Sequence, residues 1–77
     1  MATTAYVLIQ VEVGKRGIAE QVRAIDGVTS ADEVTGPYDV IVRTETDSVD
    51  DLGRMVVSQI QLIEGITRTV TCPVMNL

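Results

Sequence analysis

Histidine, phenylalanine and tryptophan do not occur in this sequence of 77 residues, and cysteine occurs once, as Cys72. Without histidine, the chain lacks the side chain that most often serves as a general base or a metal ligand near neutral pH. No glycine-rich phosphate loop, cysteine pair or serine with a neighbouring base replaces it. A single cysteine excludes an intrachain disulfide and indicates a reducing compartment. The residues therefore predict a protein that is not an enzyme and holds no metal or other cofactor.

Basic residues are also few. Six lysines and arginines stand against eleven aspartates and glutamates, which gives a net charge of -5 at pH 7. Proteins that bind nucleic acid need clustered basic side chains to neutralise phosphates, and here only Lys15 and Arg16 are adjacent. We interpret this pair as solvated side chains in a turn, with anion binding as the alternative. The charge predicts no direct binding to DNA.

Long apolar runs are absent too. None approaches the roughly 18 residues that span a membrane, and the N-terminal Met-Ala-Thr-Thr lacks the basic region of a signal peptide. These features predict a cytoplasmic protein without membrane contact. The chain is expected to form one domain, residues 1–77, and a chain near 60 residues buries only about 60% of its unfolded surface. Because no Phe or Trp enlarges the core, we expect oligomerisation to supply part of the stability.

A turn at Gly36–Asp39 divides the chain into two similar halves. Its glycine and proline are together typical of turns, and a β-branched run, Val40–Thr44, follows it. The letters IDGVT at positions 25–29 recur as IEGIT at positions 63–67. In both copies the pattern ends a helix and begins a strand. The sequence therefore predicts one strand–helix–strand unit used twice.

The predicted elements form a ferredoxin-like α+β fold of the order β-α-β-β-α-β. Both helices must lie on one face of its four-stranded antiparallel sheet, because strand–helix–strand connections are right-handed. The expected spatial order 4-1-3-2 makes the last strand an edge, which suits Pro73 because proline cannot donate a ladder hydrogen bond. The strands are expected at Tyr6–Val13, Val28–Thr35 (bulged near Asp32 and Glu33), Val40–Thr44 and Ile66–Val74.

Apolar residues at helical spacing mark the buried side of two helices. They are Ile18, Val22 and Ile25 in the first helix, and Val49, Leu52, Val56, Ile60 and Ile63 in the second. The first helix is expected to end at Gly27 and the second to be capped by Asp47 or Ser48. Asp50 and Asp51 resemble a metal-binding pair, but the start of a helix favours carboxylates without any ligand, and we adopt that interpretation.

Alternation along the first strand predicts two different sheet faces. Val7, Ile9, Val11 and Val13 should meet the helices, whereas Tyr6 and Leu8 point the other way. We expect Ile41 and the threonines at 67, 69 and 71 on that second face, and Cys72 in the core. Leaving Leu8 and Ile41 in water would forgo about 25 cal/mol per Å² of apolar area. The sequence therefore predicts that this face is buried against a second copy, most simply in a symmetric dimer.

The central turn is also a candidate binding site for a small polar molecule. Backbone N–H groups near Gly36 can approach a ligand closely because no side chain is in the way. Asp39 can receive an ammonium group, and the hydroxyls of Thr69 and Thr71 can donate and accept hydrogen bonds. A zwitterionic amino acid fits these groups. In the alternative, Asp39 stabilises its own turn and the threonines are simply good strand formers; the spacing leaves both open.

Three segments of the chain resemble the effector-binding module, or RAM domain, of the Lrp/AsnC family of transcription regulators. They are Ile25–Val28 with its helix-ending glycine, Val34–Val40 with a Gly-x-Tyr-Asp turn, and Ile63–Thr71, which fits the closing Gly-Val-x-x-Thr-x-Thr strand. The resemblance runs from about Tyr6 to Val74. It implies a ferredoxin-like domain that dimerises through its sheets, with dimers assembling into rings, typically octamers or decamers.

The resemblance also implies a ligand site and a role. In the family, amino acids or related metabolites bind between neighbouring dimers, which by position implies contacts from Gly36, Tyr38, Asp39, Thr69 and Thr71. Relatives often carry a polar or acidic residue where Pro37 stands, so we expect no contact there. Full-length regulators have a helix-turn-helix domain upstream, whereas only Met1–Ala5 precede the first strand here. A stand-alone oligomeric module is implied, one that binds an amino acid and modulates transcription or metabolism through partners such as full-length Lrp/AsnC regulators.

Two other classes of protein share this topology. An ACT-type domain also binds amino acids, and its ligand glycine tends to follow the first strand, where Gly14 and Gly17 occur. A ligand located there, rather than at Gly36–Asp39, would favour that class. A small dimeric ferredoxin-like monooxygenase or muconolactone isomerase usually has aromatic residues or a histidine in its cavity. Against that class, the aromatic residues of this chain are two tyrosines.

Overall fold

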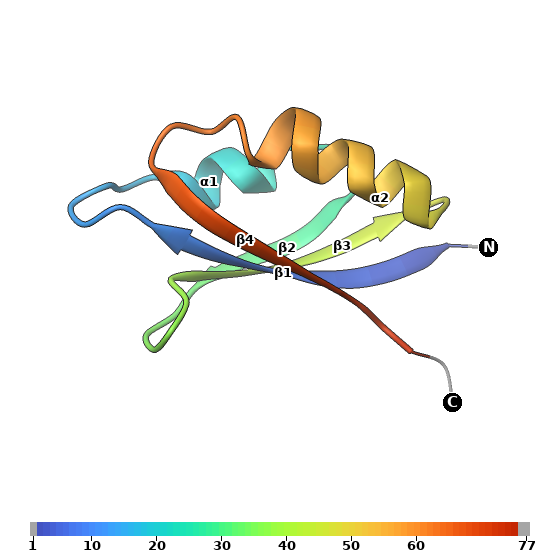
Figure 1. Cartoon of the computed structure of the whole chain (residues 1–77), viewed down its shortest axis with the longest axis horizontal. Helices are drawn as coiled ribbons and strands as arrows, with labels where there is room; N and C mark the ends of the chain where they lie inside the picture. The colour runs from blue at the N-terminus through green and yellow to red at the C-terminus, as the bar shows by residue number, and fades with distance from the viewer. Residues whose placement is uncertain (1, 76–77) are drawn as a thin grey trace.

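A computed structural model describes residues 2–75 of the chain. Its strands are β1 (Thr3–Val11), β2 (Val28–Glu33), β3 (Val40–Thr46) and β4 (Ile66–Pro73), and its helices are α1 (Ile18–Arg23) and α2 (Val49–Met55), which continues into the π-helical turn η1 (Val56–Ile60). The strands form one antiparallel sheet in the order β2-β3-β1-β4. Both helices lie on the same side of it (Figure 1). The ferredoxin-like α+β fold and the strand order 4-1-3-2 are confirmed.

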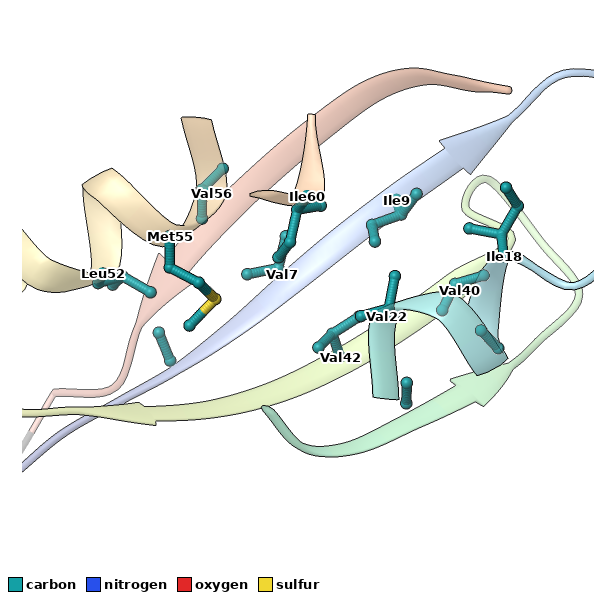
Figure 2. Packing of buried hydrophobic residues seen from close by; sticks show 13 residues of the cluster. Val7, Ile9, Ile18, Val22, Val40, Val42, Leu52, Met55, Val56 and Ile60 are labelled. Carbon is teal, nitrogen blue, oxygen red and sulfur yellow. The ribbon is translucent and has the colours of Figure 1, made fainter. Parts of the chain in front are cut away.

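The hydrophobic core lies between the helices and the two central strands (Figure 2). Val7 and Ile9 of β1 and Val42 of β3 are fully buried, because alternate residues of a strand point to the same face. The helix layer adds Ile18, Ala19, Val22, Leu52, Met55, Val56 and Ile60. This confirms the predicted apolar stripes within the helices except at Val49, which is 61% exposed because it is the first residue of α2 and lies at the end of the helix layer. The predicted helix end at Gly27 is wrong, because α1 ends at Arg23. Ile25 and Ile63 therefore follow the helices and are only partly buried.

The start of α2 is fixed by a serine cap. The Ser48 hydroxyl accepts a hydrogen bond from the Asp51 backbone N–H at 3.1 Å, which satisfies one of the free donors of the first turn. Of the two predicted caps, Asp47 and Ser48, the structure therefore uses Ser48. The Asp51 carboxylate also pairs with Arg54 at 3.2 Å, as expected for a carboxylate that stabilises a helix start.

Two strand predictions need correction. Val13 does not face the helices: β1 ends at Val11, and Val13 is fully exposed in the connection to α1. The bulge of β2 is at Thr29 and not near Asp32, because the pairing with β3 shifts between Val28 and Ser30 and is regular from there on. The Thr29 hydroxyl donates to the Arg43 carbonyl at 3.1 Å, so the bulged residue is still tied to β3.

The largest correction concerns the faces of β4. Tyr6 pairs with Cys72 and Val7 with Thr71, and residues paired across strands share a face. Thr69 and Thr71 therefore lie on the helix-covered side, which is the opposite of the prediction. Cys72 is exposed rather than buried. The helix-free side, called the open face below, carries Thr4, Tyr6, Leu8, Gln10, Ser30, Asp32, Ile41, Arg43, Glu45, Arg68, Val70 and Cys72.

The repeated sequence forms a repeated structure. Gly27 follows α1 with φ +95° and Gly65 follows η1 with φ +102°, conformations that favour glycine. The carbonyl of Gly27 accepts from the Glu45 N–H at 2.7 Å, and that of Gly65 accepts from the Glu12 N–H at 2.7 Å. Each glycine thus ties the helix-to-strand connection of its half to the other half, Gly27 to β3 and Gly65 to the residue after β1.

Replacing the two glycines by alanine is expected to destabilise the fold unequally. At Gly27 a Cβ would lie 3.2 Å from the Glu45 carbonyl oxygen and 3.2 Å from the Met55 methyl carbon, whereas at Gly65 it would meet only the flexible Lys15 side chain, at 2.8 Å. Both variants share the backbone strain of about 1–3 kcal/mol, and Gly27→Ala should lose roughly 1 kcal/mol more because packed groups must shift. Urea unfolding of both variants measures the difference, and an equal or smaller loss at Gly27 would contradict it.

Candidate functional site

The turn between β2 and β3 is tied to the last residues of β1. The Asp39 N–H donates to the Ile9 carbonyl at 2.8 Å, and one Asp39 carboxylate oxygen accepts the Val11 N–H at 2.7 Å. The Gln10 side-chain amide donates to the Pro37 carbonyl at 2.9 Å. Gly36 is exposed, with φ +130° and no atom within 4 Å of the position of a Cβ. Hydrogen bonds therefore hold the turn at Asp39, whereas the backbone at Gly36 is accessible.

A surface groove of about 540 Å³ lies beside this turn. The connection from β1 to α1 forms one wall, and Val34, Asp39 and Val40 line the other. Figure 1 shows that this connection and the β2–β3 turn lie at the same end of the sheet. The lining residues include Glu12, Gly14, Lys15, Arg16, Gly17 and Glu33. The groove can hold a small polar molecule between acidic and basic side chains.

The predicted binding residues of β4 lie on the other side of β1. Thr69 pairs with Ile9 and Thr71 with Val7, whereas Asp39 bonds to Ile9 from the β3 side. The Thr69 hydroxyl accepts from the Gln61 side-chain amide at 3.0 Å, and it borders a separate, smaller groove. Within residues 2–75 of one chain, Thr69 and Thr71 are half-buried and lie apart from the turn that holds Asp39.

Two features of the groove were missed or set aside at the sequence level. Gln10 was not singled out, although its amide supports the turn; a polar residue in a strand gives no signal of that role. Lys15 and Arg16 are exposed, as expected for solvated side chains, and both also line the groove. Lys15 pairs there with Glu64 at 3.2 Å. Gly14 and Gly17 line the same groove as Asp39, so the positions expected for an ACT-type ligand and for a Gly-x-Tyr-Asp ligand are neighbours in this fold.

The open face is the second candidate site. Ile41, Leu8 and Val70 are direct neighbours in a row across β3, β1 and β4. Ile41 is 36% exposed and Tyr6, on the same face, is 41% exposed. Figure 1 shows no element of residues 2–75 covering this side of the sheet. A row of apolar side chains at the middle of a sheet face is the kind of surface that a protein partner buries.

The family model for the Lrp/AsnC ligand binding domain matches residues 4–77. The chain belongs to the Lrp/AsnC family. This confirms the resemblance drawn from the Gly-x-Tyr-Asp turn and from the segments around Gly27 and Gly65, and it places the domain in a family of regulators. In residues 2–75 of this Lrp/AsnC domain, no helix is both long enough and apolar enough to cross a membrane.

Relatives of this Lrp/AsnC domain include longer proteins. An uncharacterized HTH-type transcriptional regulator of Pyrococcus horikoshii, PH1916, is 31% identical over 75 residues, which are 92% of this chain and 50% of that protein. The chain spans about half the length of the curated relatives it matches. The hypothetical protein PHS023 of Pyrococcus horikoshii has a TM-score of 0.87 at 33% identity, and the match covers 100% of this chain and 93% of that one.

A more distant structure shares the fold alone. The transcriptional regulator NMB0573 of Neisseria meningitidis, solved as a complex with L-Met, has a TM-score of 0.86 at 17% identity. The match covers 96% of this chain and 50% of that one.

Proposed function

We propose that this chain is an oligomeric effector-binding module that binds a small metabolite, most simply an amino acid, and regulates through partner proteins without catalysing a reaction. The match of residues 4–77 to the Lrp/AsnC ligand binding domain carries this proposal. The L-Met bound by NMB0573, a regulator of the same fold, supports the amino-acid class. The mixed charge of the groove beside Asp39 also suits a zwitterion.

Assembly is part of the proposed function. A dimer formed through the open face would bury the row of Ile41, Leu8 and Val70, and further contacts between dimers would build an octamer or decamer. Because Thr69 and Thr71 lie apart from Gly36, Tyr38 and Asp39 within one chain, a ligand that touches both groups needs them from neighbouring copies. Full-length Lrp/AsnC regulators, which share this module, are the proposed protein partners.

A thermal-shift screen of the common amino acids tests the binding. A ligand at a hundredfold excess over its Kd stabilises the protein by about 2.7 kcal/mol, which raises the Tm of a domain of this size by roughly 10–20 °C. Thr69→Val removes the hydroxyl and keeps the shape, so it should weaken the binding of the active amino acid at least tenfold, on the order of one lost hydrogen bond.

Thr3→Val is the matched control, because it makes the same change at a strand residue that lines neither groove. It should leave the affinity within about twofold of wild type, which is a smaller loss of binding free energy than that of one hydrogen bond. If no amino acid raises the Tm, the proposed ligand class is wrong. If the two valine variants bind equally, Thr69 is not a ligand contact.

A further inference from the structure

The Asp39 side chain accepts a hydrogen bond from β1 at a position that β3 does not reach. The last pair between these strands is Ile9 with Val40, so the Val11 N–H has no β3 backbone opposite it. The Asp39 carboxylate accepts this N–H at 2.7 Å, a short hydrogen bond of the charge-assisted kind. The Asp39 backbone is bonded as well, since its N–H reaches Ile9 and its carbonyl accepts from Val34 at 2.9 Å.

The other side of the β1 end is held by β4 and its preceding turn. The Glu12 N–H donates to the Gly65 carbonyl at 2.7 Å, and the Lys15 N–H donates to the Glu12 carbonyl at 3.1 Å. The wall of the groove that begins at Glu12 is thus fixed between Gly65 on one side and the Asp39 carboxylate on the other. Removing the carboxylate would free one of these two attachments.

We propose that Asp39 is a positioning residue of the effector site, whose carboxylate holds the end of β1 and the groove wall from Glu12 to Gly17, and that it is not the charge that receives the ammonium group of an amino acid. The second half of this inference rests on the proposed function. One carboxylate oxygen already accepts the Val11 N–H, so Asp39 offers an ammonium group fewer free acceptor sites than a carboxylate without such a bond. Glu12 and Glu33 border the same groove and supply negative charge for that contact.

Two variants of the full chain separate positioning from charge. Asp39→Asn removes the charge and keeps an oxygen that can accept the Val11 N–H, whereas Asp39→Ala removes both. Asp26→Asn, at an exposed position outside this groove, is the control for the loss of one charge. The first readout is hydrogen exchange of the Val11 amide, and the second is the affinity for the amino acid that stabilises the wild type most.

If Asp39 acts by positioning the strand end, Asp39→Asn should keep both the Val11 exchange rate and the amino-acid affinity close to wild type. In Asp39→Ala, Val11 exchange should accelerate at least tenfold and the affinity should fall at least tenfold, on the scale of one charge-assisted hydrogen bond. Asp39→Asn and Asp26→Asn should stay within about threefold of wild type in both readouts, because a neutral acceptor is weaker than a charged one but still bonds.

The inference is overturned if Asp39→Asn protects Val11 but binds the amino acid as weakly as Asp39→Ala, since the ligand then needs the charge. It is also overturned if Val11 exchange in Asp39→Ala equals that of wild type. Should Asp39→Ala not fold, a tenfold loss of affinity in Asp39→Asn alone contradicts it. If the wild type binds no amino acid, the proposed function fails, and the Val11 exchange rates still decide whether Asp39 positions the strand end.

Discussion

Replacing Leu8 by glutamate is expected to dissociate the protein into folded monomers. Leu8 lies at the middle of the open face, directly between Ile41 and Val70. In a symmetric dimer through this face, the substitution buries an unpaired carboxylate in each copy, which costs several kcal/mol, and it also removes apolar contact. We expect the dimer Kd to rise at least a hundredfold, which corresponds to about 2.7 kcal/mol. Native mass spectrometry over a micromolar concentration series measures it.

Val57→Glu is the control for Leu8→Glu. Val57 is 62% exposed on the helix layer, so this variant adds the same charge to an apolar position away from the sheet. The Val57 variant should keep the dimer. If Leu8→Glu keeps the mass of the wild type, or if both variants dissociate alike, the open face is not the principal contact between copies.

Replacing Ile9 by alanine is expected to remove a large part of the stability of the fold. Ile9 follows Leu8 in β1 but points to the opposite face, and it is fully buried between the sheet and the helices (Figure 2). A change of this kind costs about 2–5 kcal/mol, because the cavity adds to the lost burial. A chain of this length has a total stability of roughly 4–12 kcal/mol. Urea unfolding monitored by circular dichroism should show the loss.

Leu8→Ala is the matched comparison for Ile9→Ala, since both variants shorten an aliphatic side chain in the same strand. Under conditions where the protein is monomeric, Leu8→Ala should cost at least about 1 kcal/mol less than Ile9→Ala, because Leu8 is half-buried on the uncovered side of the sheet and its truncation leaves no enclosed cavity. Equal losses of unfolding free energy in the two variants would contradict the difference in burial between the two faces of β1.

The parts of the fold that follow from local signals could be predicted from the sequence. The alternation in β1 and β3, the glycines between helix and strand and the repeated IDGVT and IEGIT segments each act within a few residues. Together they gave the element order and the position of β4 at an edge. β1 begins at Thr3 instead of Tyr6 and ends at Val11 instead of Val13. The apolar alternation used to place the strand starts at Tyr6 and continues through Val13, so it shows neither bound.

The parts that depend on register could not be predicted. Both faces of β4 are mixed, so alternation shows that Thr69 and Thr71 share a face but not which face it is. The pairing of Tyr6 with Cys72 decides this. It places the two threonines on the helix-covered side of the sheet and Cys72 on the open face. The bulge at Thr29 likewise follows from pairing with β3 and has no signature in the strand itself.

The turn at the candidate site could be predicted, because glycine and proline together locate a turn, and the structure has it between β2 and β3. The role of Asp39 stayed open because its hydrogen-bond partner, Val11, is 28 residues earlier in the chain. The binding contacts of Gly36, Tyr38, Asp39, Thr69 and Thr71 stay predictions, as do the action of the module without a DNA-binding domain and its place in the cytoplasm.

The native mass of the wild-type chain at micromolar concentration tests most directly whether copies of this domain cover each other's open faces. One chain has a mass of 8.3 kDa. We expect a mass of at least two chains, with Leu8 and Ile41 protected from solvent. A stable species of 8.3 kDa with its sheet face hydrated would contradict the proposed assembly and, with it, a ligand site shared between copies.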